Sequence, residues 1–197
     1  MAPATGTSER LEDPSTLVAL CHHRWGIPII AALQRSAGGA KFVAIQSALG
    51  LSRDALSRTL AALGDLDLVL RNPGYGHPMR PEYLLTPFGE DAGPSSLAIW
   101  DAMTEHALED ALGRKWSLPA LWAIGQGAER FTEAQRSLPG VTPRALTSAL
   151  RDLEDAGLIT RDVTDDRPPG VRYSLTPAGG PIAALTDDLA CALAFGR

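Results

Sequence analysis

Lysine and cysteine are scarce in this sequence. Lys41 and Lys115 are its only lysines, and the formal net charge of the 197 residues is -5. Because cations that neutralise phosphates supply most nonspecific affinity for nucleic acid, this is not the charge balance of a protein that coats nucleic acid through a basic surface. Cys21 and Cys191 are too few for a disulfide framework and lack metal-ligand spacing, so the sequence predicts a reducing, cytoplasmic environment and no metal site.

Catalytic motifs and membrane segments are missing as well. The histidines at 22, 23, 77 and 106 form no HExxH or Cys/His pattern, no Gly-x-Ser-x-Gly elbow occurs, and Gly38-Gly39 lacks the Lys-Ser/Thr of a phosphate loop. The sequence therefore favours neither an enzyme nor a bound cofactor. No apolar run approaches the length of a bilayer span, so we expect no membrane partner. Residues 1–14 lack the features of a signal peptide and are expected to form a flexible tail.

The clearest organisation lies between residues 141 and 179. Thr142 is suited to cap a helix of residues 142–153 with Pro143 in its first turn, and three leucines recur there at helical spacing: Leu146, Leu150 and Leu153. Residues 158–161 and 171–175 alternate as β-strands do, and residues 165–170 between them are turn formers. A helix followed directly by a hairpin indicates a winged helix.

The first half of the chain repeats the second. The aligned pairs include Trp25 and Trp116, Phe42 and Phe131, Leu60 and Leu150, Arg71 and Arg161, and Tyr83 and Tyr173. The first copy has two extra residues in the loop around residues 36–39, and its wing segment, residues 72–81, contains three prolines and little strand alternation. A repeat of about ninety residues is too long for a solenoid unit and fits two fused copies of one domain.

Five motifs of the second half occur together: Lys115-Trp116-Ser117-Leu118-Pro119, Glu129-Arg130-Phe131, Leu138-Pro139-Gly140-Val141, Leu153-Glu154-Asp155-Ala156-Gly157-Leu158-Ile159 and Tyr173-Ser174-Leu175-Thr176-Pro177-Ala178-Gly179. As a set, from residue 104 to about 195, they resemble the HxlR-type winged-helix transcriptional regulators, and the first half looks like a more distant copy. In that family the terminal helices build a homodimer. The resemblance therefore implies a mainly α fold with small β wings, in which two tandem winged-helix domains form an intramolecular pseudo-dimer.

We expect the first domain at residues 15–103 and the second at residues 104–197. A single helix over residues 95–112, capped by Ser95 or Ser96 and ended by Gly113, is predicted to close the first domain and open the second. With the last helix, residues 182–195, it would form the pseudo-dimer interface.

If double-stranded DNA is the partner, the helices of residues 52–63 and 142–153 each lie in a major groove, where the first turns of a helix reach base edges. The candidate DNA-binding residues face outward on these helices or lie in the second wing: Arg53, Ser57, Arg58, Arg144, Thr147, Ser148, Arg151, Arg167 and Arg172. The alternative for each is an ordinary solvated side chain. Family recognition helices usually carry an arginine just before the second leucine, where this chain has Thr59 and Ala149.

Two functions remain open at this point. The first is a cytoplasmic transcription regulator that reads an imperfect palindrome as a single-chain pseudo-dimer, alone or as a further homodimer. The alternative is a winged-helix protein that has lost specific DNA binding and sequesters a hydrophobic small molecule. One protein can have both functions. A ligand that binds one spacing of the two reading helices, residues 52–63 and 142–153, better than another spacing changes the affinity for DNA.

The tryptophans indicate where such a ligand would bind. Trp25 and Trp116 occupy equivalent places in the repeat, which argues for core packing. Trp100 and Trp122 have no counterpart in the first copy, and they could line a cavity for a flat aromatic ligand at the seam between the copies. The candidate ligand-binding residues are Trp100, Trp122, His22, His106 and Met103, and core packing is the alternative for both tryptophans.

Overall fold

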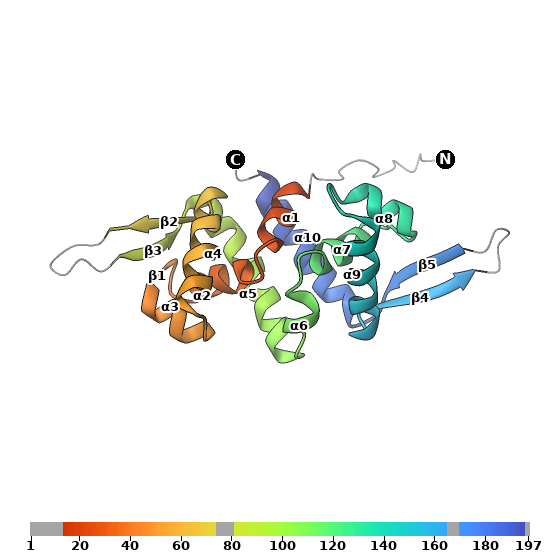
Figure 1. Cartoon of the computed structure of the whole chain (residues 1–197), viewed down its shortest axis with the longest axis horizontal. Coiled ribbons are helices and arrows are strands. Elements are labelled where there is room, and N and C mark those ends of the chain that lie inside the picture. Colours follow the sequence, from red (N-terminus) through yellow and green to blue (C-terminus); the bar gives the residue numbers. More distant parts are fainter. Residues whose placement is uncertain (1–13, 74–80, 165–169, 196–197) are drawn as a thin grey trace, which may run out of the picture.

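The computed structural model describes residues 14–73, 81–164 and 170–195 (Figure 1). The first half contains α1 (Ser15–Cys21), α2 (Gly26–Arg35), β1 (Gly39–Lys41), α3 (Phe42–Leu49), α4 (Arg53–Asp65), β2 (Val69–Asn72), β3 (Glu82–Leu85) and α5 (Pro87–Glu105). The second half contains α6 (Glu109–Leu112), α7 (Ser117–Gly125), α8 (Phe131–Ser137), α9 (Pro143–Asp155), β4 (Ile159–Thr164), β5 (Gly170–Leu175) and α10 (Gly179–Phe195). Two helical units with small antiparallel wings confirm the predicted fold class.

The helix predicted at residues 142–153 forms as α9 for the expected reasons. The Thr142 hydroxyl accepts a hydrogen bond from the Ala145 backbone N–H at 3.2 Å, and Pro143 occupies the first turn. Its leucines are buried and line the face that packs into the core. Gly157 lies in the left-handed region at φ 69° just beyond the helix end. Helix α4 begins in the same way, with the Ser52 hydroxyl accepting from the Ala55 N–H.

The two wings differ in their sheets. In the second half β4 and β5 form a two-stranded antiparallel ladder from the pair Ile159 and Leu175 to the pair Thr164 and Gly170. In the first half β2 and β3 pair over only four residues each, which agrees with the weak alternation, but β1 joins β3 as a third strand. In the second half a single backbone hydrogen bond, from the Tyr173 N–H to the Glu129 carbonyl at 2.8 Å, takes the place of that strand.

In both halves a threonine and a glycine join three elements: the wing, the reading helix before it (α4 or α9) and the closing helix after it (α5 or α10). The Thr176 hydroxyl donates to the Gly157 carbonyl at 2.7 Å and accepts from the Gly179 N–H at 3.0 Å. Thr86 makes the equivalent pair of bonds, to the Asp67 carbonyl and from the Gly89 N–H. A Cβ added to Gly179 would lie 1.9 Å from the Leu158 carbonyl oxygen, and one added to Gly89 would lie 2.0 Å from that of Leu68. The closing helices can therefore approach the strands this closely only through glycine.

The single helix predicted over residues 95–112 is wrong. Helix α5 begins earlier, at Pro87, where Thr86 caps it, and it continues through Pro94 to Glu105. The chain then breaks because Ala107 adopts φ 54°, and the Leu108 N–H turns back to the Met103 carbonyl at 2.8 Å. A separate short helix, α6, follows. The closing helix of the first half is thus distinct from the opening helix of the second.

The two halves are arranged about an approximate two-fold axis along the viewing direction of Figure 1. The wings extend in opposite directions from the two ends, α3 lies below α4 where α8 lies above α9, and α1 and α6 lie on opposite sides of the centre. Between the halves, α10 packs against α5, α7 and α1. Helices α4 and α9 therefore occupy equivalent positions and face the same side of the molecule.

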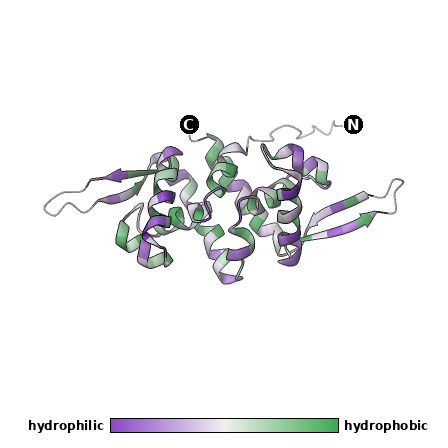
Figure 2. Cartoon of the chain, viewed as in Figure 1, coloured by the Kyte–Doolittle hydropathy of each residue, from purple (hydrophilic) through white to green (hydrophobic). Residues whose placement is uncertain are grey.

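One hydrophobic core runs through both halves. It includes Leu17, Ile29 and Leu56 from the first and Leu150 and Leu189 from the second. Figure 2 shows hydrophobic residues over much of the central helices and both hydrophobic and hydrophilic residues along the wings. Within the described ranges, no single helix is long and apolar enough to cross a membrane; α1 and α2 reach that length and composition only when joined across a bend of 90°.

Candidate nucleic-acid interface

The exposed face of α9 carries the residues predicted for it. Arg144, Thr147, Ser148 and Arg151 are all exposed, because the leucines of the same helix point into the core. The Thr147 hydroxyl donates back to the Pro143 carbonyl at 2.8 Å, so its oxygen still has acceptor capacity toward a ligand. This face offers two guanidinium groups, which can grip guanine with two hydrogen bonds, beside two hydroxyls.

The exposed face of α4 carries a different set. Arg53, Ser57 and Arg58 are exposed as predicted. Arg58 is partly held by its own helix, since its Nε donates to the Asp54 carbonyl at 3.3 Å. The Arg53 guanidinium lies 5.9 Å from the centre of the Phe42 ring, within the range of a cation–π contact. The first reading face is therefore restrained by contacts within its own half.

Helices α4 and α9 have the same length, so their exposed positions can be compared one to one. Each contains 13 residues and begins directly after its capping residue. Of the first five exposed positions after the caps, four differ in charge: Arg53 and Pro143, Asp54 and Arg144, Arg58 and Ser148, and Ala61 and Arg151. The fifth pair is Ser57 and Thr147. The two faces have the same shape and present different chemistry.

The positions at which family members usually carry arginine are turned inward. Thr59 is 5% exposed and Ala149 is 4% exposed. The Thr59 hydroxyl donates to the Ala55 carbonyl at 2.9 Å within the helix. Neither side chain lies on the outer face, so neither contributes to the surface that α4 and α9 expose.

Ion pairs modify the charge around the second reading helix. Arg114 lies 2.7 Å from the Asp152 carboxylate, whose side chain is only 19% exposed, and so neutralises one acid of α9. The wing residue Arg172 lies 3.2 Å from Glu129, with both side chains about half exposed. An exposed pair of this kind is weak, at about 0–1 kcal/mol, so Arg172 can exchange Glu129 for a phosphate. Arg167 lies outside the described residues.

Two exposed wing arginines were not among the predicted candidates. Arg71 on β2 and Arg161 on β4 are exposed, and each pairs across its ladder with a tyrosine, Tyr83 or Tyr173. Their matched positions in the repeat were the signal that marked them. They add one cation to each wing close to the end of the reading helix.

The candidate ligand-binding residues do not converge on one site. Trp100 and Met103 line a cavity of about 360 Å³ beside α6. Trp122 is 1% exposed and borders a different cavity of about 450 Å³ near α8. Its indole N–H donates to Asp187 Oδ1 at 2.9 Å, and the Gln126 amide donates to the same oxygen at 2.6 Å. The single cavity expected from the two tryptophans is thus divided.

The two candidate ligand-binding histidines lie at the surface. His22 and His106 are exposed, and neither lines the two larger cavities. His22 lies 5.4 Å from the His23 ring, centre to centre. Burial, with a smaller contribution from the neighbouring charge of His22, lowers the pKa of His23 below its usual value of 6.5. His23 therefore loses its proton more readily than an ordinary histidine does.

Cys21 is a structural thiol. It is buried in the core, and burial raises the pKa of Cys21 to about 12. Because the thiolate is the reactive form, this cysteine is unreactive at neutral pH. Its burial argues against thiol-based sensing at this position.

Comparison with known proteins gives the same picture for both halves. The sequence profile of the HxlR-like helix-turn-helix family matches residues 20–109 and again residues 111–192. An uncharacterized HTH-type transcriptional regulator of Methanothermobacter thermautotrophicus is 41% identical over 78 residues, which cover 40% of this chain and 60% of that protein. The regulator YvaP of Bacillus subtilis is 31% identical over 80 residues, covering 41% of this chain and 74% of its own. The matched segment therefore spans less than two thirds of the first relative.

Solved structures that match this chain each cover less than half of it. A crystal structure of a transcriptional regulator assigned to the MarR family from Enterococcus faecalis is 36% identical, covers 48% of this chain and 77% of its own, and has a TM-score of 0.37. Diamide-treated YodB from B. subtilis is 26% identical, covers 42% and 81%, and also has a TM-score of 0.37. With the family profile matched twice along most of its length, this chain belongs to the HxlR-like helix-turn-helix family of transcriptional regulators.

Proposed function

We propose that this regulator binds double-stranded DNA as a single-chain pseudo-dimer, with α4 and α9 in successive major grooves on one face of the duplex. The observation that carries the proposal is the two-fold relation of α4 and α9 (Figure 1). Two reading helices related in this way match two half-sites about one helical turn apart, or a small multiple of that, roughly 34 Å per turn. The domains would be residues 15–103 and 104–197, with α5 and α10 packed at the interface between them.

The half-sites differ because the reading faces differ. Arg144 and Arg151 on α9 suit guanine, whereas Asp54 on α4 presents a carboxylate that can accept a hydrogen bond from cytosine. A chain of this kind reads an imperfect palindrome and binds it in one orientation only. A regulator made of two identical subunits has no such polarity.

The acidic balance limits the affinity that comes from phosphates alone. The net charge is -5, and the wing and reading-helix arginines are few. Each phosphate contact contributes about one unit to the slope of log affinity against log salt, so a shallow slope is expected beside a clear preference for one sequence. The contacts in this scheme are made by the residues predicted on both helices, by Arg172, and by Arg71 and Arg161.

The test is binding of the full chain to DNA selected from a random pool, measured by fluorescence anisotropy and by footprinting. We expect an asymmetric site protected over both half-sites. Arg144→Ala and Arg151→Ala should each weaken binding by about 1–3 kcal/mol and relax preference in one half-site only. Arg136→Ala, which removes an exposed arginine of α8 outside the reading face, is the charge-matched control. Protection of one half-site, or equal losses in all three variants, contradicts the proposal.

A sequestering protein without DNA binding is the rival function. It gains no support from the family, whose members in the comparison are named as regulators. No preference for any sequence at low salt would favour it. Sedimentation of the DNA-free and DNA-bound protein decides whether one chain or a homodimer of chains occupies the site.

A further inference from the structure

The cavity of about 360 Å³ beside α6 combines aromatic walls with carboxylates. Trp25 at the start of α2 and Trp100 and Met103 near the end of α5 supply the apolar walls. Arg24, Glu109 and Asp110 supply the charged rim. Its volume lies within the range of small-molecule sites, roughly 300–1,000 Å³. The lining comes from the first half and from α6, the first helix of the second half.

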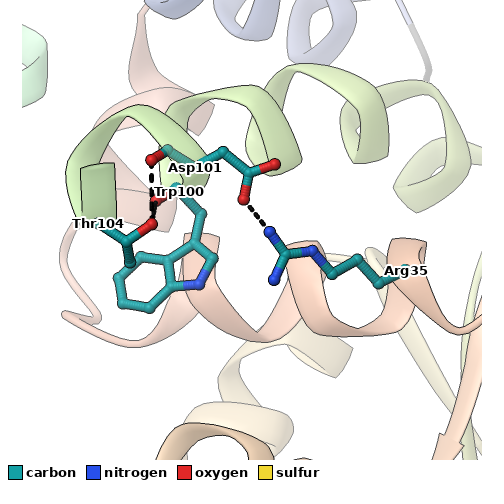
Figure 3. A network of polar contacts seen from close by, with 4 residues as sticks. All are labelled: Arg35, Trp100, Asp101 and Thr104. Atoms are coloured by element: carbon teal, nitrogen blue, oxygen red, sulfur yellow. Dashed lines mark hydrogen bonds and ion pairs between the residues drawn. The ribbon is translucent and has the colours of Figure 1, made fainter. Parts of the chain in front are cut away.

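Trp100 is half-buried and packs against the edge of the core. Figure 3 shows its indole projecting from α5 toward α2, beside the ion pair between Arg35 and Asp101. The Thr104 hydroxyl lies within hydrogen-bonding distance of the Trp100 carbonyl at 3.0 Å and the Asp101 carbonyl at 2.9 Å, which stabilises the last turn of α5. The residue in the same place on α10 is Ala190, which is 5% exposed. A methyl group is therefore sufficient at this position in the other half.

The cavity already contains the contacts that a planar cation makes. The Arg24 guanidinium lies 5.6 Å from the centre of the Trp25 ring and 2.7 Å from the Asp110 carboxylate. Glu109 is half-buried in the same lining. Two carboxylates against one guanidinium leave an excess negative charge, and the faces of indole rings attract cations.

The other half lacks these features. Lys115 lies 4.8 Å from the centre of the Trp116 ring, as Arg24 lies over Trp25. The positions equivalent to Glu109 and Asp110 are Val18 and Ala19, and Ala190 replaces the second indole. The aromatic and acidic combination therefore occurs in one half only, so the fold does not demand it.

We propose that this cavity binds a flat aromatic cation, held between Trp25 and Trp100 with its charge toward Glu109, because Arg24 already pairs with Asp110. Because α6 belongs to the second half and the other walls to the first, a bound cation favours one arrangement of the halves. The arrangement of the halves sets the spacing of α4 and α9. If the cation binds one arrangement more tightly than another, its binding changes the affinity for DNA by the same factor. Only this last step rests on the proposed DNA-binding function.

The test uses the full chain with two dyes of one shape, N-methylacridinium, which carries a permanent charge, and acridine at pH 8, which is neutral. Equilibrium dialysis without DNA gives both affinities. We expect one N-methylacridinium per chain, bound roughly tenfold more tightly than acridine. Glu109→Gln should weaken binding of N-methylacridinium roughly fivefold and leave binding of acridine unchanged. Trp100→Ala should weaken binding of both dyes roughly tenfold. Asp188→Asn removes an exposed carboxylate of α10 as the matched control and should change neither.

Equal affinity for the two dyes, or cation binding that survives Glu109→Gln unchanged, overturns the inference. If Trp100→Ala fails to fold by circular dichroism, Glu109→Gln still decides. The DNA titration is separate: a chain that binds N-methylacridinium but no DNA keeps this site and loses the proposed function. A chain that binds its DNA but neither dye keeps the proposed function and loses this site.

Discussion

The two adjacent glycines at the start of α10 should respond to the same substitution in opposite ways. A Cβ at Gly179 would lie 1.9 Å from the Leu158 carbonyl oxygen, whereas real Cβ contacts are almost never under 3.0 Å, so backbone must move by about 1 Å. Such overpacking costs about 1–3 kcal/mol, and the obstacle here is backbone that cannot rotate away. We expect Gly179→Ala to lower the free energy of unfolding by about 3 kcal/mol.

Gly180 provides the matched control one residue along the same helix. Nothing lies within 4 Å of a Cβ added there. Alanine restricts the unfolded chain and favours the helix, so Gly180→Ala should raise the free energy of unfolding by about 0.5 kcal/mol. Urea denaturation of both variants measures the difference. Equal effects, or a Gly179→Ala variant as stable as the parent, would refute the argument that a close approach fixes this joint.

Three further predictions concern groups whose properties burial changes. Asp187→Ala leaves the buried Trp122 indole N–H without its acceptor and should cost about 1–3 kcal/mol in urea denaturation, whereas Asp188→Ala should stay within about 0.5 kcal/mol; similar losses would contradict this. Because the pKa of Cys21 is raised to about 12, iodoacetamide at pH 8 should label it slowly in the native protein and rapidly in urea, and equal rates would argue against its burial. The lowered pKa of His23 means that the unfolded chain binds a proton more readily, so stability should fall as the pH drops through 6.5, and His23→Gln should reduce that slope; an unchanged slope would exclude His23 as its source.

Much of the fold follows from local sequence. The cap at Thr142 and the spacing of Leu146, Leu150 and Leu153 place α9 within two residues at its C-terminal end, because cap and periodicity act within one helix. The repeat transfers the same reasoning to α4. The exposed faces of both helices follow too, since burial of the leucines determines which residues face outward.

The remainder depends on contacts between distant segments. The break after α5 rests on the left-handed backbone of Ala107, a residue with no local turn signal. Trp122 looked like a partner of Trp100 on the sequence, but its indole bonds to Asp187, 65 positions away, and spacing carries no information about such a pairing. The third strand β1 was missed because its three residues gain strand geometry only by pairing with β3.

The short connection between α5 and α6 has a consequence for how such a regulator responds to its own abundance. Subunits that must first meet lose operator occupancy steeply on dilution, because pairing and DNA binding both depend on concentration. Two halves joined by residues 106–108 meet at an effective concentration that does not change on dilution. Under the proposed mode, occupancy of the DNA site therefore depends on the first power of the protein concentration. Such a chain would give a graded response down to a few copies per cell, where a dissociating dimer would already have released its site.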